Sequence, residues 1–124
     1  MITNAGLNLL RDALKGDVTD AQIKYVAWGD DNTTPAATDI ALGNELGRKA
    51  VTNRASGGIG IVDTIVYLSQ SDAVGNIKEL GFFAGASASA TPDSGILVSR
   101  ILYAKNKTNL EAIQINLKDT IKEE

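Results

Sequence analysis

Apolar residues near the start of the chain follow the spacing of a short helix. Thr3 or Asn4 is a suitable N-cap, and Gly16 stands where a left-handed residue commonly ends a helix. We therefore predict a helix over residues 1–16. We expect its apolar stripe to pack on the protein's own core, with docking on a neighbouring subunit as the alternative. The stripe consists of Leu7, Leu10 and Leu14, with Leu9 and Ala13 beside it.

From residue 23 onward the apolar period changes from 3.6 to 2, which indicates β-strands. A hairpin turn is expected at Ser56-Gly57-Gly58, between the second and third of these strands. One helix followed by about six short strands predicts a mainly β fold, either an antiparallel β-sandwich or a barrel-like domain with a short N-terminal α-helix. We expect one domain over residues 1–124, with a β-rich body at 23–121. The predicted strands are residues 23–29, 48–55, 59–70, 77–83, 96–104 and 110–121.

The predicted strands differ in how apolar their two faces are. Residues 59–70 are apolar on both faces, which predicts a central strand or one covered by a partner, and residues 96–104 share this character. Residues 110–121 alternate between apolar and polar side chains, which predicts a half-buried strand with one wet face. Two polar segments, residues 30–39 and 85–95, are predicted loops, and we expect the second to be flexible.

Composition narrows the classes of function. The 124-residue chain carries 12 basic and 15 acidic residues, a net charge of −3, so nucleic acid is not an expected partner. The sequence has no Cys and no His, which excludes disulfides and catalysis or metal binding through those side chains. The chain also lacks an apolar run long enough to span a bilayer and a secretory signal at its start. We therefore expect a non-enzymatic protein with no cofactor and no membrane partner.

Three groups of polar residues are candidate sites. Asp30, Asp31 and Asn32 carry oxygens suited to a hard cation, but a solvated turn is the favoured interpretation. The Gly57-Gly58-Ile59-Gly60 stretch lacks the residues that complete a phosphate-binding loop, and strand follows it rather than helix. The carboxylates are too scattered for the sequence to predict a hydrolytic pair. They are Glu45, Asp63, Glu79 and Glu111. We expect no catalytic, cofactor-binding or metal-binding residue.

Six segments occur in a distinctive order along almost the whole chain. They are residues 2–7 (Ile-Thr-Asn-Ala-Gly-Leu), 25–29 (Tyr-Val-Ala-Trp-Gly), 33–35 (Thr-Thr-Pro), 42–51 (Leu-Gly-Asn-Glu-Leu-Gly-Arg-Lys-Ala-Val), 76–83 (Asn-Ile-Lys-Glu-Leu-Gly-Phe-Phe) and 95–100 (Gly-Ile-Leu-Val-Ser-Arg). Their order and spacing resemble a family of small tailed-bacteriophage proteins of the tail-fibre-like or virion structural kind. The resemblance implies a β-rich, non-catalytic and oligomeric building block of a virus particle.

Four charged residues lie in the segments that carry this resemblance: Glu45, Arg48, Glu79 and Arg100. We expect them to form buried or interfacial ion pairs that fix the geometry of loops. Arginine suits this role because its planar guanidinium binds a carboxylate through two parallel hydrogen bonds.

The leading hypothesis is therefore a structural component of a bacteriophage particle, in a tail fibre or baseplate. It would act through contacts with its own copies, most simply as a trimer, and with other virion proteins. Its location would be the virion, after synthesis in the cytoplasm of the host bacterium. The alternatives are a capsid decoration protein on the head surface and a receptor- or carbohydrate-binding module at a fibre tip. A carboxylate-based hydrolase is a third class.

Overall fold

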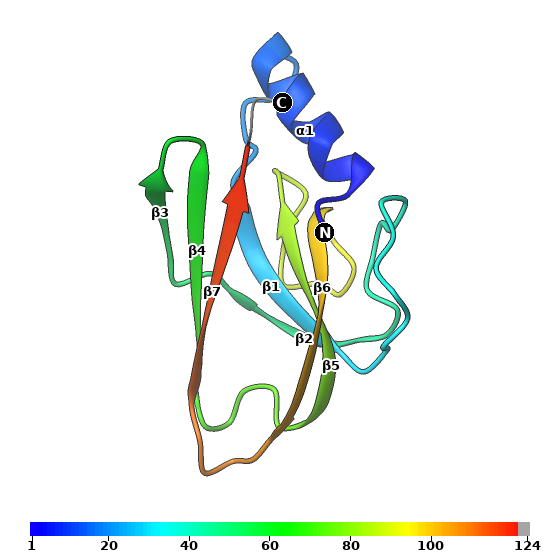
Figure 1. Cartoon of the computed structure of the whole chain (residues 1–124), viewed down its shortest axis with the longest axis vertical. Helices are drawn as coiled ribbons and strands as arrows, with labels where there is room; N and C mark the ends of the chain where they lie inside the picture. Colours follow the sequence, from blue (N-terminus) through cyan, green and yellow to red (C-terminus); the bar gives the residue numbers. More distant parts are fainter. Residues whose placement is uncertain (122–124) are drawn as a thin grey trace.

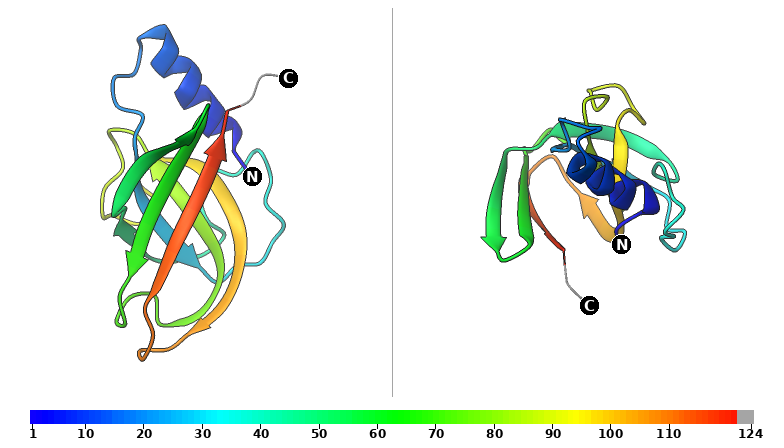
Figure 2. Two further views of the ribbon diagram at one scale, coloured as in Figure 1. Left: turned by 60° about the vertical axis from the view of Figure 1, so that its left-hand side comes forward. Right: turned by 90° about the horizontal axis from the view of Figure 1, so that it is seen from above.

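Two antiparallel sheets pack face to face, and one helix lies over their end (Figures 1 and 2). The computed structural model describes residues 1–121. The predicted mainly β class is confirmed, and because the sheets do not close on each other the fold is a β-sandwich. The elements are α1 (Asn4–Lys15), β1 (Ile23–Gly29), β2 (Glu45–Ala50), β3 (Asn53–Gly58), β4 (Ile61–Leu68), β5 (Gly75–Ala84), β6 (Ile96–Lys107) and β7 (Ile113–Thr120).

The chain crosses from one sheet to the other between β2 and β3. Sheet A has the strand order β2-β1-β5-β6, and sheet B has the order β3-β4-β7. The N–H of Val51 donates to Lys24 in sheet A, whereas the N–H of the next residue, Thr52, donates to Ile65 in sheet B. The prediction of one strand over residues 48–55 is therefore wrong, because the chain changes partners within it.

The hairpin between β3 and β4 exists, but its turn is not where the glycines predicted it. Ser56 and Gly58 lie within β3, and the turn falls at residues 59–60. Gly60 has a φ of 69°, a conformation that favours glycine. The turn is displaced because β3 keeps its pairing with β4 up to Gly58, through an irregularity after Ser56.

Helix α1 begins and ends at the residues that the sequence indicated as caps. The Thr3 hydroxyl accepts a hydrogen bond from the N–H of Gly6, and Gly16 is left-handed with a φ of 86°. Residues 1–3 are not helical, contrary to the predicted range of 1–16. They pair with β6 instead, since Ile2 forms a bridge with Ser99.

The helix buries a different face from the one its leucines predicted. Gly6 and Leu9 are buried, whereas Leu7 is 53 % exposed and Leu14 is 91 % exposed. The pairing of residues 1–3 with β6 sets the rotation of the helix, because the N–H of Thr3 donates to Val98 just before the helix begins. Leu9 nevertheless joins the protein's own core, as expected.

Gly6 allows the helix to lie directly on β6. A Cβ atom at Gly6 would lie 2.8 Å from the carbonyl oxygen of Val98. We therefore expect Gly6→Ala to lower the free energy of unfolding by about 1–3 kcal/mol, although alanine is the better helix former. Urea denaturation measures this change. The exposed Asn8→Ala is the control and should be neutral or slightly stabilising. A Gly6→Ala variant as stable as wild type would contradict the close packing.

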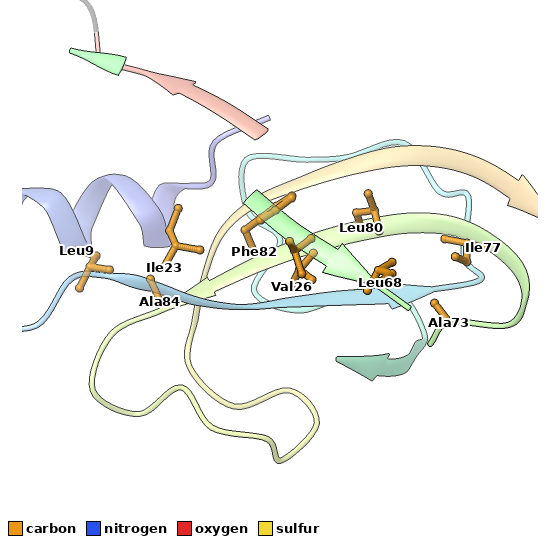
Figure 3. Close-up of a cluster of buried hydrophobic side chains, with 10 residues drawn as sticks. Leu9, Ile23, Val26, Leu68, Ala73, Ile77, Leu80, Phe82 and Ala84 are labelled. Atoms are coloured by element: carbon orange, nitrogen blue, oxygen red, sulfur yellow. The ribbon is translucent and has the colours of Figure 1, made fainter. Parts of the chain in front are cut away.

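The main hydrophobic core lies between the two sheets and continues beneath α1 (Figure 3). The strand residues that point into it come from β1, β4 and β5, with partly buried side chains of β6 and β7 packed against them. Strand β4 is central in sheet B, as predicted, and the expected alternation of burial along β7 is confirmed. The buried members are Leu9, Ile23, Val26, Val66, Leu68, Ala73, Ile77, Leu80, Phe82 and Ala84.

A second, smaller core covers the other side of sheet A, here called the outer face. Ala27, Phe83 and Leu97 point to this side, and Leu42 packs on them from the long segment between β1 and β2. Both faces of sheet A are therefore covered, one by sheet B and the other by loops. The candidate site lies in this covering layer.

Candidate functional site

Glu79 and Arg100 form a buried ion pair on the outer face of sheet A. They belong to the neighbouring strands β5 and β6. The Nε of Arg100 donates to Oε1 of Glu79 at 2.9 Å, and their side chains are 3 % and 0 % exposed. Two of the four residues singled out in the sequence are thus brought together, although 21 positions separate them.

The Glu79 carboxylate also holds both ends of the loop between β1 and β2. Near the start of this loop, the N–H of Asp31 donates to Oε2 at 3.0 Å. At its end, the N–H groups of Gly43 and Asn44 donate to the two oxygens at 2.9 Å. Together with Arg100, the carboxylate accepts four hydrogen bonds, so its charge is well satisfied despite complete burial.

Arg100 completes the attachment of this loop from the other side. Its Nη1 donates to the carbonyl of Thr33 at 2.8 Å, and its Nη2 donates to the carbonyl of Asp31 at 3.3 Å. The carboxylate of Asp39 lies 3.6 Å from Nη1. The Glu79–Arg100 pair therefore connects two strands of sheet A to the loop that covers them.

Gly29 is a part of this site that the sequence analysis missed. A Cβ atom there would collide with the Glu79 carboxylate and with the carbonyl of Asn44. Glycine at the end of β1 is thus what lets the loop and the carboxylate approach the strand. The only sequence signal is a glycine directly after the strand residue Trp28, which is too common to be diagnostic.

Arg48 and Glu45 form a second buried pair, on the edge strand β2. The guanidinium binds the carboxylate through two hydrogen bonds of 2.8 Å, and each side chain is 2 % exposed. The guanidinium carbon also lies 4.4 Å from the centre of the Phe83 ring, within the range of a cation–π contact. This pair is a short-range one, as the spacing of three residues suggests.

The second pair holds the loop between β5 and β6. Nη1 of Arg48 donates to the carbonyls of Ser89 and Ser94, both at 3.0 Å, and Glu45 accepts from the N–H of Asp93 at 3.2 Å. Within the loop, the Ser94 hydroxyl donates to the carbonyl of Thr91 at 2.7 Å. The expectation of a flexible loop at residues 85–95 did not foresee these bonds, which attach the loop to sheet A.

The acidic segment after β1 forms a turn. Asp31 Oδ1 accepts from the N–H of Thr33, and Asp30 accepts from the side-chain amide of Asn44. Hydrogen bonding from Thr33, with Arg100 nearby, lowers the pKa of Asp31. Among residues 1–121, no group of three or more side chains gathers in a way that would hold a metal ion. These contacts account for the acidic residues as turn and ion-pair partners.

The four carboxylates considered for hydrolysis each lie beside a cation of their own. This arrangement differs from a hydrolytic pair, in which two carboxyl groups face one another across a cleft. The pairs are Glu45 with Arg48, Glu79 with Arg100, Asp63 with Lys118, and Glu111 with Lys105.

The aromatic residues mostly serve packing. Phe82 and Phe83 are fully buried on opposite faces of sheet A. The Trp28 ring lies over Gly47 on the neighbouring strand, where a Cβ atom would be 2.6 Å from the ring. These three side chains do not form an exposed platform for a ligand.

Comparison of the chain with known protein families finds no match, and comparison with characterised proteins finds none either. The helix found in the described residues is too short and too polar to cross a membrane.

One further carboxylate, Asp119 on β7, differs from these four because it forms no ion pair within residues 1–121. Its Oδ2 atom is buried and has no hydrogen-bond partner among the described residues. Burial raises the pKa of Asp119, since an apolar environment disfavours the charged form. The folded chain therefore keeps this proton to a higher pH than the unfolded chain does.

We expect Asp119→Asn to become more stable relative to wild type as the pH rises. The contribution of Asp119 to stability is complete below the unfolded pKa of about 3.9 and is lost as the pH rises through the raised folded value. Urea denaturation of both proteins from about pH 4 to about pH 8 measures the difference. Asp63→Asn, which removes a carboxylate bonded to Lys118, is the control and should show no such gain. A difference that does not change with pH would refute the prediction.

Proposed function

We propose that this protein is a non-enzymatic structural component of a bacteriophage particle, in a tail fibre or baseplate, and acts through protein–protein contacts. The observation that supports this most is the use of the four charged residues in the phage-like segments. They form two buried pairs that hold two long loops on sheet A. A particle component must present a fixed surface to its neighbours, and satisfied buried polar networks favour one rigid arrangement.

We propose further that the protein assembles with its own copies, as a trimer. Strand β3 supports such contacts, because it is an edge strand of sheet B and all six of its residues are exposed (Figure 1). An exposed strand edge presents unpaired backbone groups that another chain can bind. Light scattering at micromolar concentration should give the mass of a trimer. A monomer would overturn this part of the proposal.

The two alternative functions predict different experimental results. A decoration protein would occupy the head surface, and a receptor-binding module would bind glycans at a fibre tip. The second has less support, because the loop at residues 85–95 is tied to Arg48 and the phenylalanines are buried. A glycan-array signal that disappears in Trp28→Ala would favour it over a structural role.

Immunogold electron microscopy of purified particles tests the main proposal. An antibody to this chain should label the tail, and the protein should appear in mass spectra of the same particles. Label on the head would replace the tail assignment with capsid decoration. Absence of the protein from both images and spectra would overturn the structural role altogether.

A further inference from the structure

A cavity of about 400 Å³ opens between the two sheets beneath α1. Its walls come from the helix, from both sheets and from the residue that follows β7, and they are mostly apolar. Sites for small molecules commonly have volumes of about 300–1,000 Å³ and a mainly apolar lining with few polar groups. Prominent lining residues are Leu9, Leu10, Ile23, Val62, Val98 and Ile121.

Among the described residues that line this cavity, Asp119 supplies the only carboxylate. It continues the inward-facing series of β7, which includes Ile115 and Leu117. Its Oδ2 has no hydrogen-bond partner within residues 1–121. A buried carboxylate oxygen without a donor is costly, so a ligand that supplies a donor there is favoured.

Two cationic groups that could interact with Asp119 have hydrogen-bond partners of their own. Nη1 of Arg54, from β3, donates to the carbonyl of Ile23 at 2.9 Å. The N-terminal ammonium of Met1 donates to the carbonyl of Arg100 at 3.1 Å. Neither forms an ion pair with Asp119 within 4.0 Å among the described residues, although the charge of the N-terminal ammonium opposes the effect of burial on the pKa of Asp119. The cavity therefore combines an apolar wall with one carboxylate oxygen that no described residue bonds.

We propose that this cavity binds an aliphatic chain that carries one primary ammonium group. The chain would lie against Leu9, Ile23 and Val98, and the ammonium would donate to Oδ2 of Asp119. An ammonium fits better than a guanidinium because it is a compact charge that does not require a planar, two-pronged acceptor. A hydrogen bond to a charged group is about twice as strong as a neutral one, which provides selectivity over an alcohol. This inference does not depend on the proposed function.

Nuclear magnetic resonance titration with three probes of equal length tests the site. Hexylamine, hexanol and hexanoate are added separately to the full-length protein, and amide shifts of the cavity residues are followed. We expect hexylamine to bind about tenfold more tightly than hexanol, which corresponds to one charge-assisted hydrogen bond. Hexanoate should bind more weakly than hexanol because it faces Asp119. A separate titration with an N-acetylated Leu-Lys-Leu amide tests whether the ammonium comes from a lysine side chain of another protein. Tighter binding of this peptide than of hexylamine would identify that source.

Variants separate the carboxylate from the apolar wall. Asp119→Asn should remove the preference for hexylamine over hexanol, whereas Asp63→Asn, on the outer side of sheet B, should keep it. Val62→Phe, in the wall of the cavity, should weaken the binding of all three probes to the same extent. A parallel titration uses Lys122→Gln, so that the chain's own amine three residues beyond Asp119 does not compete. Equal binding of the three probes, a preference that survives Asp119→Asn, or no binding of any probe would overturn the proposal.

Discussion

Arg100→Ala is expected to lower the free energy of unfolding by about 3–5 kcal/mol, because it leaves the buried Glu79 carboxylate without its cation. The variant also removes the bonds from Arg100 to the carbonyls of Thr33 and Asp31. The loop between β1 and β2 should then loosen around Thr33, while Asp31 and Gly43 stay bound to Glu79. Urea denaturation measures the loss of stability, and hydrogen exchange of the loop amides measures the detachment.

The ion pair of Lys118 with Asp63 provides a matched control. Lys118 is 66 % exposed, and exposed pairs contribute about 1 kcal/mol or less. Lys118→Ala should therefore change stability far less than Arg100→Ala does. Combining Arg100→Ala with Glu79→Gln should cost less than the sum of the two single changes, since each removes the same interaction. Equal effects of Arg100→Ala and Lys118→Ala would show that the buried pair is not what holds the loop.

Arg48→Ala is expected to cost about 3 kcal/mol or more, for the same reason, because the Glu45 side chain is also buried. It should have a second effect that Arg100→Ala does not share. Arg48 binds the carbonyls of Ser89 and Ser94, so its loss should release the loop at residues 85–95. Elastase, whose specificity pocket accepts small side chains, should then cleave within this alanine-rich loop under native conditions.

Arg48→Lys separates charge from geometry at this position. Lysine keeps the charge but cannot make two parallel bonds to Glu45 and also reach two carbonyls of the loop. We expect a loss of about 1–3 kcal/mol and faster cleavage by elastase than in wild type. A lysine variant with wild-type stability and resistance would mean that charge alone suffices there.

Together, these variants test whether the loops on sheet A form a fixed surface. The proposed role in a particle depends on that property, because neighbouring subunits bind a surface whose shape is already set. In variants that still fold, loosening of these loops should therefore weaken the expected self-association as well as lower the free energy of unfolding. Light scattering of Arg48→Lys, the mildest of these changes, is suited to that comparison.

Local patterns in the sequence were sufficient for several elements. The bounds of β1 at Ile23–Gly29 were predicted correctly, because a run of β-branched and aromatic residues is followed by a polar turn. The caps of α1 at Thr3 and Gly16 were predicted for a similar reason, since capping depends on bonds within one turn of the chain. The alternation along β7 indicated which residues face the core.

Tertiary contacts decided what these patterns left open. Residues 48–55 have the character of one strand, and only the separate partners of Val51 and Thr52 divide it between two sheets. The rotation of α1 follows from the pairing of residues 1–3 with β6, so leucine spacing alone selected the wrong face.

The candidate site shows the same division. The sequence by itself determined that Arg48 and Glu45 lie three positions apart and that residues of the right types for buried pairs were present. The irregularity of β2 between Glu45 and Gly47 is what places both side chains on one face of sheet A. The sequence did not determine that Arg100 meets Glu79, or that one carboxylate holds both ends of a loop. Those contacts join residues far apart in the chain, and only the packing of β5 beside β6 and of the loop over Gly29 brings them within bonding distance.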